Sequence, residues 1–107
     1  MKELINKIHC MAADELNRAN ETWPQFHSKH EAIGVLDEEL FEKSEEADRV
    51  SMYSRELHAA VYKDYDLDKP IRRMEINLAA ELAEGIQVLA MLKKFRCLIE
   101  SEKNDEV

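Results

Sequence analysis

Glycine and proline are scarce in this sequence, with two residues of each among 107. Sheets of short strands need many turns, and turns depend heavily on these two residue types. Their scarcity, together with a charged fraction of 36%, disfavours a sheet and favours a few long helices. The length is sufficient for one domain with a modest core.

The sequence also lacks paired cysteines, a basic excess and long apolar runs. Cys10 and Cys97 lie far apart without a CxxC pair, which favours reduced thiols over a disulfide framework or a zinc site. The net charge of −8 argues against direct binding to nucleic acid. No apolar run approaches the roughly 18 residues of a membrane span, and the first twenty residues carry acids at Glu3, Asp14 and Glu15, unlike a secretory signal. We therefore expect a cytoplasmic protein without a membrane partner.

Apolar residues recur at helical spacing in three segments, which predict helices over 2–20, 28–63 and 70–99. Ser28 and Glu31 fit a capping box at the start of the second helix. That helix is long enough to leave open a kink between Ser44 and Ser54.

Three long helices with short connectors predict an all-α fold, an antiparallel helical bundle. The third helix is apolar on two faces, more than two partner helices can cover, so we expect dimerisation to complete the bundle. Residues 1–101 are predicted to form a single domain, and 102–107 a disordered tail.

Two helices carry acidic residues beside their apolar stripes. Glu38, Glu39 and Glu42 share roughly one face of the second helix, although like charges at this spacing repel. In "AELAEGIQVLAML", Glu81, Glu84 and Gln87 form a narrow polar strip on the most apolar helix. Both strips have a simple alternative explanation, namely that they are solvent-exposed helix edges.

The two strips converge if the second and third helices pack antiparallel. Facing carboxylates in a partly buried site cannot all stay ionised without a cation. Carboxylate oxygens suit Mg²⁺, which also bridges to phosphates, with Mn²⁺ as an alternative. A turn centred near residue 65 or 66 puts Glu84 level with about Arg49, and Gln87 with about Glu45. That register leaves Glu45, Glu46 and Asp48 open as alternative ligands.

A second acidic pattern, "DYDLDKPIRRME", has the spacing of a calcium-binding EF-hand loop. Asp64, Asp66, Asp68 and Glu75 fall at loop positions one, three, five and twelve. Lys69 occupies the sixth position, which requires glycine, so turn formation is the simpler role for these aspartates. Nucleophilic catalysis has little support, because no histidine shows triad-like spacing to a serine or cysteine. The histidines are His9, His27, His30 and His58.

The acidic segments resemble the all-α NTP pyrophosphatase superfamily of MazG-like proteins. "EELFE", Glu38 to Glu42, is similar to its EExxE motif, and "HEAIGVLDEELFEKSEE" resembles a phage and bacterial MazG-like subgroup. "EGIQVLAMLKKF" resembles the second motif of that subgroup, with Glu84 and Gln87 where many members have ExxD. The resemblance covers about residues 28–96.

The resemblance implies Mg²⁺-dependent hydrolysis of a nucleoside triphosphate to the monophosphate and pyrophosphate, by a homodimer or homotetramer. Glu39, Glu42 and Glu84 would be the catalytic metal ligands. The other implied site residues are Glu38 and Gln87 at the metal; Lys43, Arg72, Arg73 and Glu81 at the substrate; and Trp23, Phe26 or Tyr53 at the base. The alternatives are a non-enzymatic helical oligomerisation or interaction protein, and an inactive MazG-like relative.

Overall fold

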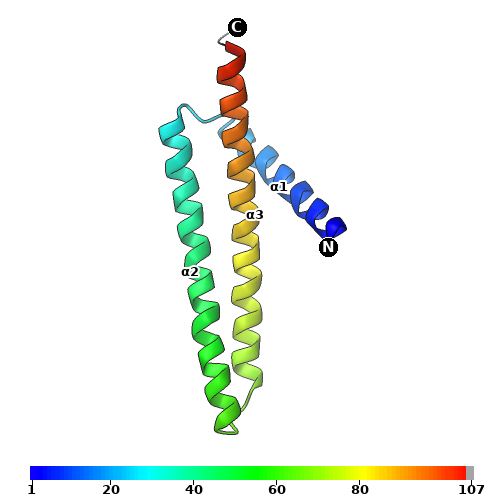
Figure 1. The fold of residues 1–107 in the computed structure, drawn as a ribbon, viewed down its shortest axis with the longest axis vertical. Helices are drawn as coiled ribbons and strands as arrows, with labels where there is room; N and C mark the ends of the chain where they lie inside the picture. The colour runs from blue at the N-terminus through cyan, green and yellow to red at the C-terminus, as the bar shows by residue number, and fades with distance from the viewer. Residues whose placement is uncertain (106–107) are drawn as a thin grey trace.

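The computed structural model describes residues 1–105, and every regular element in that range is a helix. The helices are α1 (Lys2–Thr22), α2 (Lys29–Tyr62) and α3 (Asp68–Asp105), as Figure 1 shows. The prediction of an all-α fold is confirmed. Its physical basis is the scarcity of glycine and proline, because only Pro24 and Pro70 interrupt the chain and both lie at or before a helix start.

The helix ends carry the expected capping and turn chemistry. Ser28 Oγ accepts a hydrogen bond of 3.1 Å from the backbone N–H of Glu31, which caps α2. At the other end of α2, Asp64 adopts a left-handed conformation with φ of 56°. Asp66 Oδ1 accepts from the backbone N–H of Asp68 at 3.2 Å, at the start of α3. Since α3 already begins at Asp68, the EF-hand alternative is wrong, and these aspartates shape a turn.

α2 is uninterrupted, and α3 is longer than the sequence indicated. α2 is one continuous helix, so it has no break between Ser44 and Ser54. α3 continues through Asp105, whereas its predicted end lies near Ile99. Residues 102–105 of the predicted tail are therefore helical, and 106–107 lie outside the described residues. Glu and Lys are good helix formers, and Lys29 pairs with Glu102 at 3.3 Å, which secures this last part of α3.

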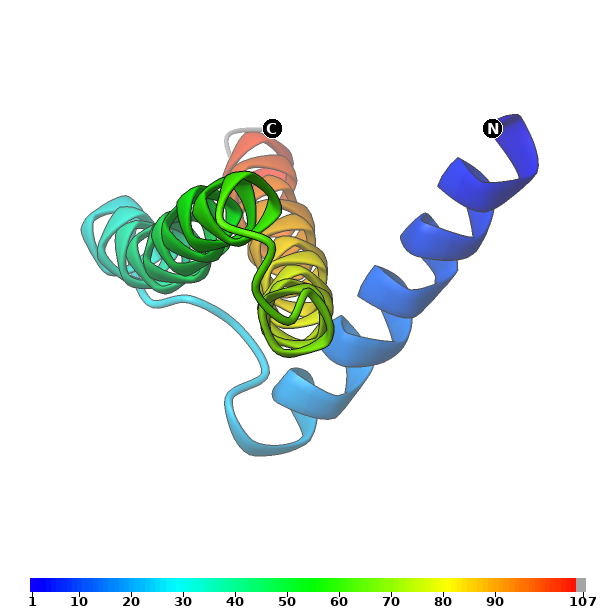
Figure 2. The same ribbon diagram turned by 90° about the horizontal axis from the view of Figure 1, so that it is seen from below.

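α2 and α3 lie side by side as an antiparallel hairpin, and α1 crosses the C-terminal half of α3 (Figures 1 and 2). The N-terminal part of α1 runs away from the hairpin. The molecule measures 67 × 30 × 23 Å, and its radius of gyration of 18.4 Å exceeds the ~13 Å of a compact domain of this length. One chain thus forms an elongated hairpin with a crossing helix, and not a closed bundle.

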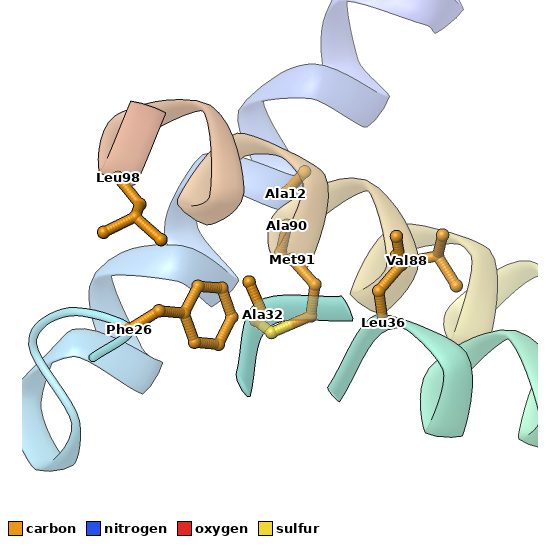
Figure 3. Packing of buried hydrophobic residues seen from close by; sticks show 8 residues of the cluster. All are labelled: Ala12, Phe26, Ala32, Leu36, Val88, Ala90, Met91 and Leu98. Carbon is orange, nitrogen blue, oxygen red and sulfur yellow. The ribbon is translucent and has the colours of Figure 1, made fainter. Parts of the chain in front are cut away.

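The apolar core occupies one end of the hairpin, where α1 and the first connector meet α2 and α3 (Figure 3). Its buried members are Ala12, Phe26, Ala32, Leu36, Val88, Ala90, Met91 and Leu98. The half of the hairpin near the second connector buries little, with Ala60 and Pro70 as its buried residues. No large side chain of the described residues is completely buried. The core of a single chain therefore ends about halfway along the hairpin.

Lys94 fastens the first connector to α3. Its side chain is 5% exposed, its ammonium donates to the backbone carbonyl of Trp23, and it lies 4.8 Å from the ring centroid of Phe26. Burial lowers the pKa of Lys94 below its ordinary value, although Glu31 opposes the shift. Phe26 is buried beneath this contact, while Trp23 remains 69% exposed.

Candidate metal centre

Three carboxylates from the two hairpin helices meet just beyond the apolar core. Glu39 and Glu42 of α2 and Glu84 of α3 each offer one oxygen, and these oxygens all lie within 4.8 Å of one another. Glu39 and Glu84 are partly buried, whereas Glu42 is exposed. Glu39 follows Leu36 by about one helical turn, and Glu84 precedes Val88 by about one turn, so the packed core fixes this carboxylate cluster from one side.

The register that brings these carboxylates together differs from the predicted one. The part of α2 that follows Glu39 is about seven residues longer than the part of α3 that precedes Glu84. This difference in length corresponds to about 10 Å along the helix axis. α2 extends past the first turn of α3, and the connector runs back along the hairpin to reach it (Figure 1). The prediction that Glu84 lies level with Arg49 is wrong, because it assumed a symmetric turn.

The carboxylates of the cluster repel one another. Burial raises the pKa of Glu39 above its ordinary value, and the neighbouring carboxylates of Glu42 and Glu84 raise it further. Glu84 Oε2 is buried and has no hydrogen-bond partner. A buried carboxylate oxygen without a donor is costly in a folded protein. A divalent cation would relieve both the repulsion and the missing contact.

A lysine lies at the edge of the carboxylate cluster. Lys43 Nζ donates to Glu81 Oε2 at 3.2 Å, and both side chains are partly buried. A Cβ at Gly85 would lie 3.6 Å from Lys43 Cε, so the lysine stem passes over this glycine. Lys43 follows Glu39 by about one turn and Glu81 precedes Glu84 by about one turn. The structure therefore places the predicted residues Lys43 and Glu81 beside the cluster, as one ion pair.

Gln87 faces a different helix. Its Nε2 donates to Glu15 Oε2 of α1 at 2.8 Å, and Glu15 also binds Arg18 at 3.0 Å. The amide of Gln87 is therefore tied to α1, and its expected place at the metal stays a prediction. Glu38 is exposed and is not part of the cluster either, although its charge adds to the raised pKa of Glu39. A residue next to Glu39 in the sequence is turned by about 100° around the helix.

The two arginines expected at the substrate lie too far along α3. Arg72 and Arg73 precede Glu84 by about three turns, or about 17 Å. Arg72 Nε binds Asp68 at 2.7 Å, and Arg73 lies 3.6 Å from Glu56. Within one chain these arginines stabilise the hairpin end and do not reach the carboxylates.

The expected base-binding residues are also dispersed. Tyr53 lies beneath the guanidinium of Arg73, 5.5 Å from it, in the half of the hairpin near the second connector. Phe26 belongs to the apolar core, and Trp23 is exposed at the end of α1. The three therefore do not form one pocket around the carboxylate cluster in a single chain.

The alternative ligands left open by the sequence have other roles. Arg49 binds Glu46 at 2.6 Å and approaches Glu45 at 3.8 Å. Asp48 is exposed. These acids follow the cluster along α2, and Arg49 pairs with two of them, although Glu46 Oε2 is itself buried without a hydrogen-bond partner.

Glu15 and Lys94 are two polar residues whose positions the sequence did not reveal. Glu15 lies in the predicted first helix without any motif, and its contact with Gln87 depends on how α1 crosses α3. Lys94 is preceded by Lys93, and nothing in the local sequence distinguishes the buried lysine from its partly exposed neighbour. The only available signal is that Lys94 lies seven residues after Gln87, on the same side of α3.

Comparison with known proteins adds no relative: no family model matches the chain, nor does any curated protein or solved structure. Among residues 1–105, no helix is both long enough and apolar enough to cross a membrane.

Proposed function

We propose that the chain is a Mg²⁺-dependent nucleoside triphosphate pyrophosphohydrolase that releases pyrophosphate and a nucleoside monophosphate. The observation that carries this proposal is the approach of Glu39 and Glu42 to Glu84 across the hairpin. The resemblance of "EELFE" and "EGIQVLAMLKKF" to MazG-like motifs supports the same function, because it names the same three glutamates.

The residues present fit a divalent metal ion. Three carboxylates supply hard oxygen ligands, and the buried Glu84 Oε2 is an acceptor that lacks a donor. Glu39, Glu42 and Glu84 would hold Mg²⁺, or Mn²⁺ as an alternative. Bound there, the ion would polarise the phosphate oxygens and lower the pKa of a water molecule.

Lys43 supplies the positive charge nearest to the carboxylate cluster. Glu81 holds its ammonium at 3.2 Å, so the lysine is oriented before substrate arrives. A triphosphate carried on the metal would lie within reach of this flexible side chain, and its negative charge would compete with Glu81 for the ammonium. Lys43 therefore binds the phosphate chain, while Glu81 positions Lys43.

A base pocket requires more than one chain. Since Trp23, Phe26 and Tyr53 lie apart in the protomer, the apolar surface for the nucleobase comes from assembly into a homodimer or homotetramer. The extended hairpin offers the exposed apolar area for such assembly.

The test compares the wild type with Glu84→Gln and with Glu100→Gln, an exposed glutamate on the same helix. Pyrophosphate release is measured over a panel of ribo- and deoxyribonucleoside triphosphates, with and without Mg²⁺. We expect Mg²⁺-dependent release by the wild type and by Glu100→Gln, and none by Glu84→Gln. Absence of release with every triphosphate, in either Mg²⁺ or Mn²⁺, would overturn the proposal.

A helical interaction protein is the second candidate, and an inactive MazG-like relative would behave similarly. The observation that favours it is the unusually large exposed apolar area of the hairpin. An interaction protein without a metal site predicts that Mg²⁺ leaves the melting temperature unchanged. An enzyme that binds the ion predicts a higher melting temperature, because a ligand at about 100 times its Kd adds about 2.7 kcal/mol to the free energy of unfolding. An inactive relative would bind the metal but release no pyrophosphate.

A further inference from the structure

A continuous stripe along α3 lies largely outside the contacts that α3 makes within the chain, although its Leu89 packs partly against the core and its Gly85 lies beside Lys43. Its residues recur at alternating spacings of four and three, the heptad pattern of a helix that packs against another helix. We call it the outer stripe; it consists of Ile71, Glu75, Leu78, Leu82, Gly85, Leu89, Leu92, Arg96 and Ile99.

The other two sides of α3 are already occupied. Glu84, Val88 and Met91 face α2, and Gln87 and Lys94 face α1 and the first connector. In Figure 2, α2 and the outer part of α1 lie on different sides of α3, and no helix of this chain covers the side between them. Four apolar residues of the outer stripe are accordingly exposed, namely Ile71 by 41%, Leu78 by 46%, Leu82 by 63% and Leu92 by 46%, whereas Leu89 and Ile99 are half-buried.

The C-terminal half of the outer stripe lies between two shallow hollows. One is formed by Leu89 and Leu92 with His9 of α1 and has Lys93 and Arg96 at its edge, and the other by Leu92 and Ile99 with Leu36 of α2, again beside Arg96. Side chains of a helix laid along the stripe would enter these hollows as knobs enter holes.

The order of residues in the outer stripe is nearly the same in both directions about Gly85. When a second α3 runs antiparallel with its Gly85 opposite this one, Ile71 meets the partner's Ile99, and Leu78 meets the partner's Leu92. Leu82 then meets the partner's Leu89. A two-fold symmetric interface needs such a self-complementary surface, in which residue i contacts j and j contacts i.

The charges of the outer stripe obey the same symmetry. Glu75 and Arg96 are exposed and occupy equivalent places on either side of Gly85. In the antiparallel arrangement Glu75 faces the partner's Arg96, and the symmetry repeats the pair at the other end. In a parallel arrangement each would face its own copy, and like charges would repel.

Gly85 has no explanation within one chain. Glycine lowers helix stability relative to alanine in the middle of a helix. The nearest atom to an added Cβ is Lys43 Cε at 3.6 Å, an ordinary van der Waals distance, so α2 does not require a glycine here. A partner helix crossing at Gly85 would require one, because two helices approach most closely where neither has a side chain, and the flexible Lys43 stem beside this glycine would turn aside on dimerisation.

The exposed area of the protomer is large enough for a stable dimer. The chain exposes 8096 Å², whereas a compact monomer of 12.5 kDa exposes about 6,200 Å². The excess of about 1,900 Å² is more than the roughly 800 Å² that each partner buries in a standard interface.

We infer that the outer stripe binds a second copy of this chain, α3 against α3 in antiparallel register, with Gly85 of both copies at the two-fold axis. The inference specifies the homodimer included in the proposed function. Its support comes from the stripe and the exposed area, and it does not depend on the carboxylate cluster. Both measurements below are made without metal or nucleotide, so their outcome is independent of catalysis.

The first experiment measures mass by light scattering after size-exclusion chromatography. The wild type is expected at twice the chain mass of 12.5 kDa or a multiple of that dimer. Leu82→Asp places a charge in the interface and is expected to yield a monomer of unchanged helical circular dichroism. Ile76→Asp, at an equally exposed apolar residue of α3 outside the stripe, is expected to keep the wild-type mass. A monomeric wild type, or an unchanged mass in Leu82→Asp, would overturn the inference.

The second experiment determines the register by disulfide cross-linking and does not rely on the aspartate variants. Cys10 and Cys97 are free, so both are first changed to serine. Leu82→Cys and Leu89→Cys are then made in separately tagged chains and oxidised alone or mixed. The antiparallel register predicts a cross-linked dimer in the mixture and little in either chain alone, because a disulfide spans only about 4.4–6.8 Å between Cα atoms. Cross-linking of Leu82→Cys chains alone, or none in the mixture, contradicts the register.

Discussion

Gln87 Nε2 donates a hydrogen bond of 2.8 Å to Glu15 Oε2, which ties α3 to α1. Arg18 also donates to Glu15, from 3.0 Å. The carboxylate of Glu15 therefore has two donors, one from Gln87 and one from Arg18. The MazG-like motif that this segment resembles often has aspartate where this chain has Gln87. Here an aspartate would remove the donor to Glu15 and add a second negative charge, so the amide suits the way α1 crosses α3.

We predict that Gln87→Asp lowers the free energy of unfolding by about 1–2 kcal/mol, because a partly buried acceptor loses its donor. Urea denaturation in metal-free buffer measures the change. Adding Glu15→Gln to Gln87→Asp restores a donor and acceptor pair with the direction reversed, and should recover most of the loss. A neutral effect of Gln87→Asp would show that the bond to Glu15 contributes little in solution.

The raised pKa of Glu39 predicts a pH dependence of metal-free stability. Below the ordinary value of 4.5 the group is protonated in both states and has no effect. As pH rises above 4.5 the unfolded chain ionises first, so the folded state loses stability until the pH passes the raised pKa. The loss then remains constant at higher pH.

Glu39→Gln should remove this contribution. Its unfolding free energy relative to the wild type is therefore expected to increase as the pH rises from the ordinary value of 4.5 through the raised pKa of Glu39, in metal-free buffer. Saturating Mg²⁺ should reduce the advantage of the variant near neutral pH, because the ion compensates the charges of the wild type. A difference that does not change with pH would mean that Glu39 ionises normally in the folded protein.

The ion pair between Lys43 and Glu81 predicts separate effects on stability and on substrate binding. A double-mutant cycle with Lys43→Met and Glu81→Gln should give a coupling of about 0.5–1 kcal/mol, since both side chains are partly exposed. In the pyrophosphatase assay Lys43→Met should raise KM for the triphosphate more than it lowers kcat, because it removes a phosphate contact. An unchanged KM would exclude Lys43 from phosphate binding.

Lys94→Ala should loosen the first connector and destabilise the protein by about 2 kcal/mol. It removes the donor to the Trp23 carbonyl and the stem that packs against Phe26. Trp23 is the only tryptophan, so its fluorescence and its quenching by acrylamide report directly on this connector. Lys103→Ala, at an exposed lysine of the same helix, is the control and should leave both readouts unchanged.

The sequence alone determined the local structure. Three apolar periodicities and the scarcity of glycine and proline specify three long helices, because helix formation depends on residues within a few turns. The Ser28 cap and the turn-forming aspartates are local in the same sense, and both predictions are confirmed. The length of α3 was underestimated, since its polar end is stabilised in part by the contact of Glu102 with Lys29.

Only the tertiary structure decided which side chains meet. The asymmetric connector sets the register that gathers Glu39, Glu42 and Glu84, and a symmetric turn would have separated them by about 10 Å. Because α1 crosses α3 where it does, Gln87 donates to Glu15, and the outer stripe stays uncovered. Helix identity follows from short-range periodicity, whereas register and crossing angle depend on packing between segments far apart in the chain, which periodicity does not encode.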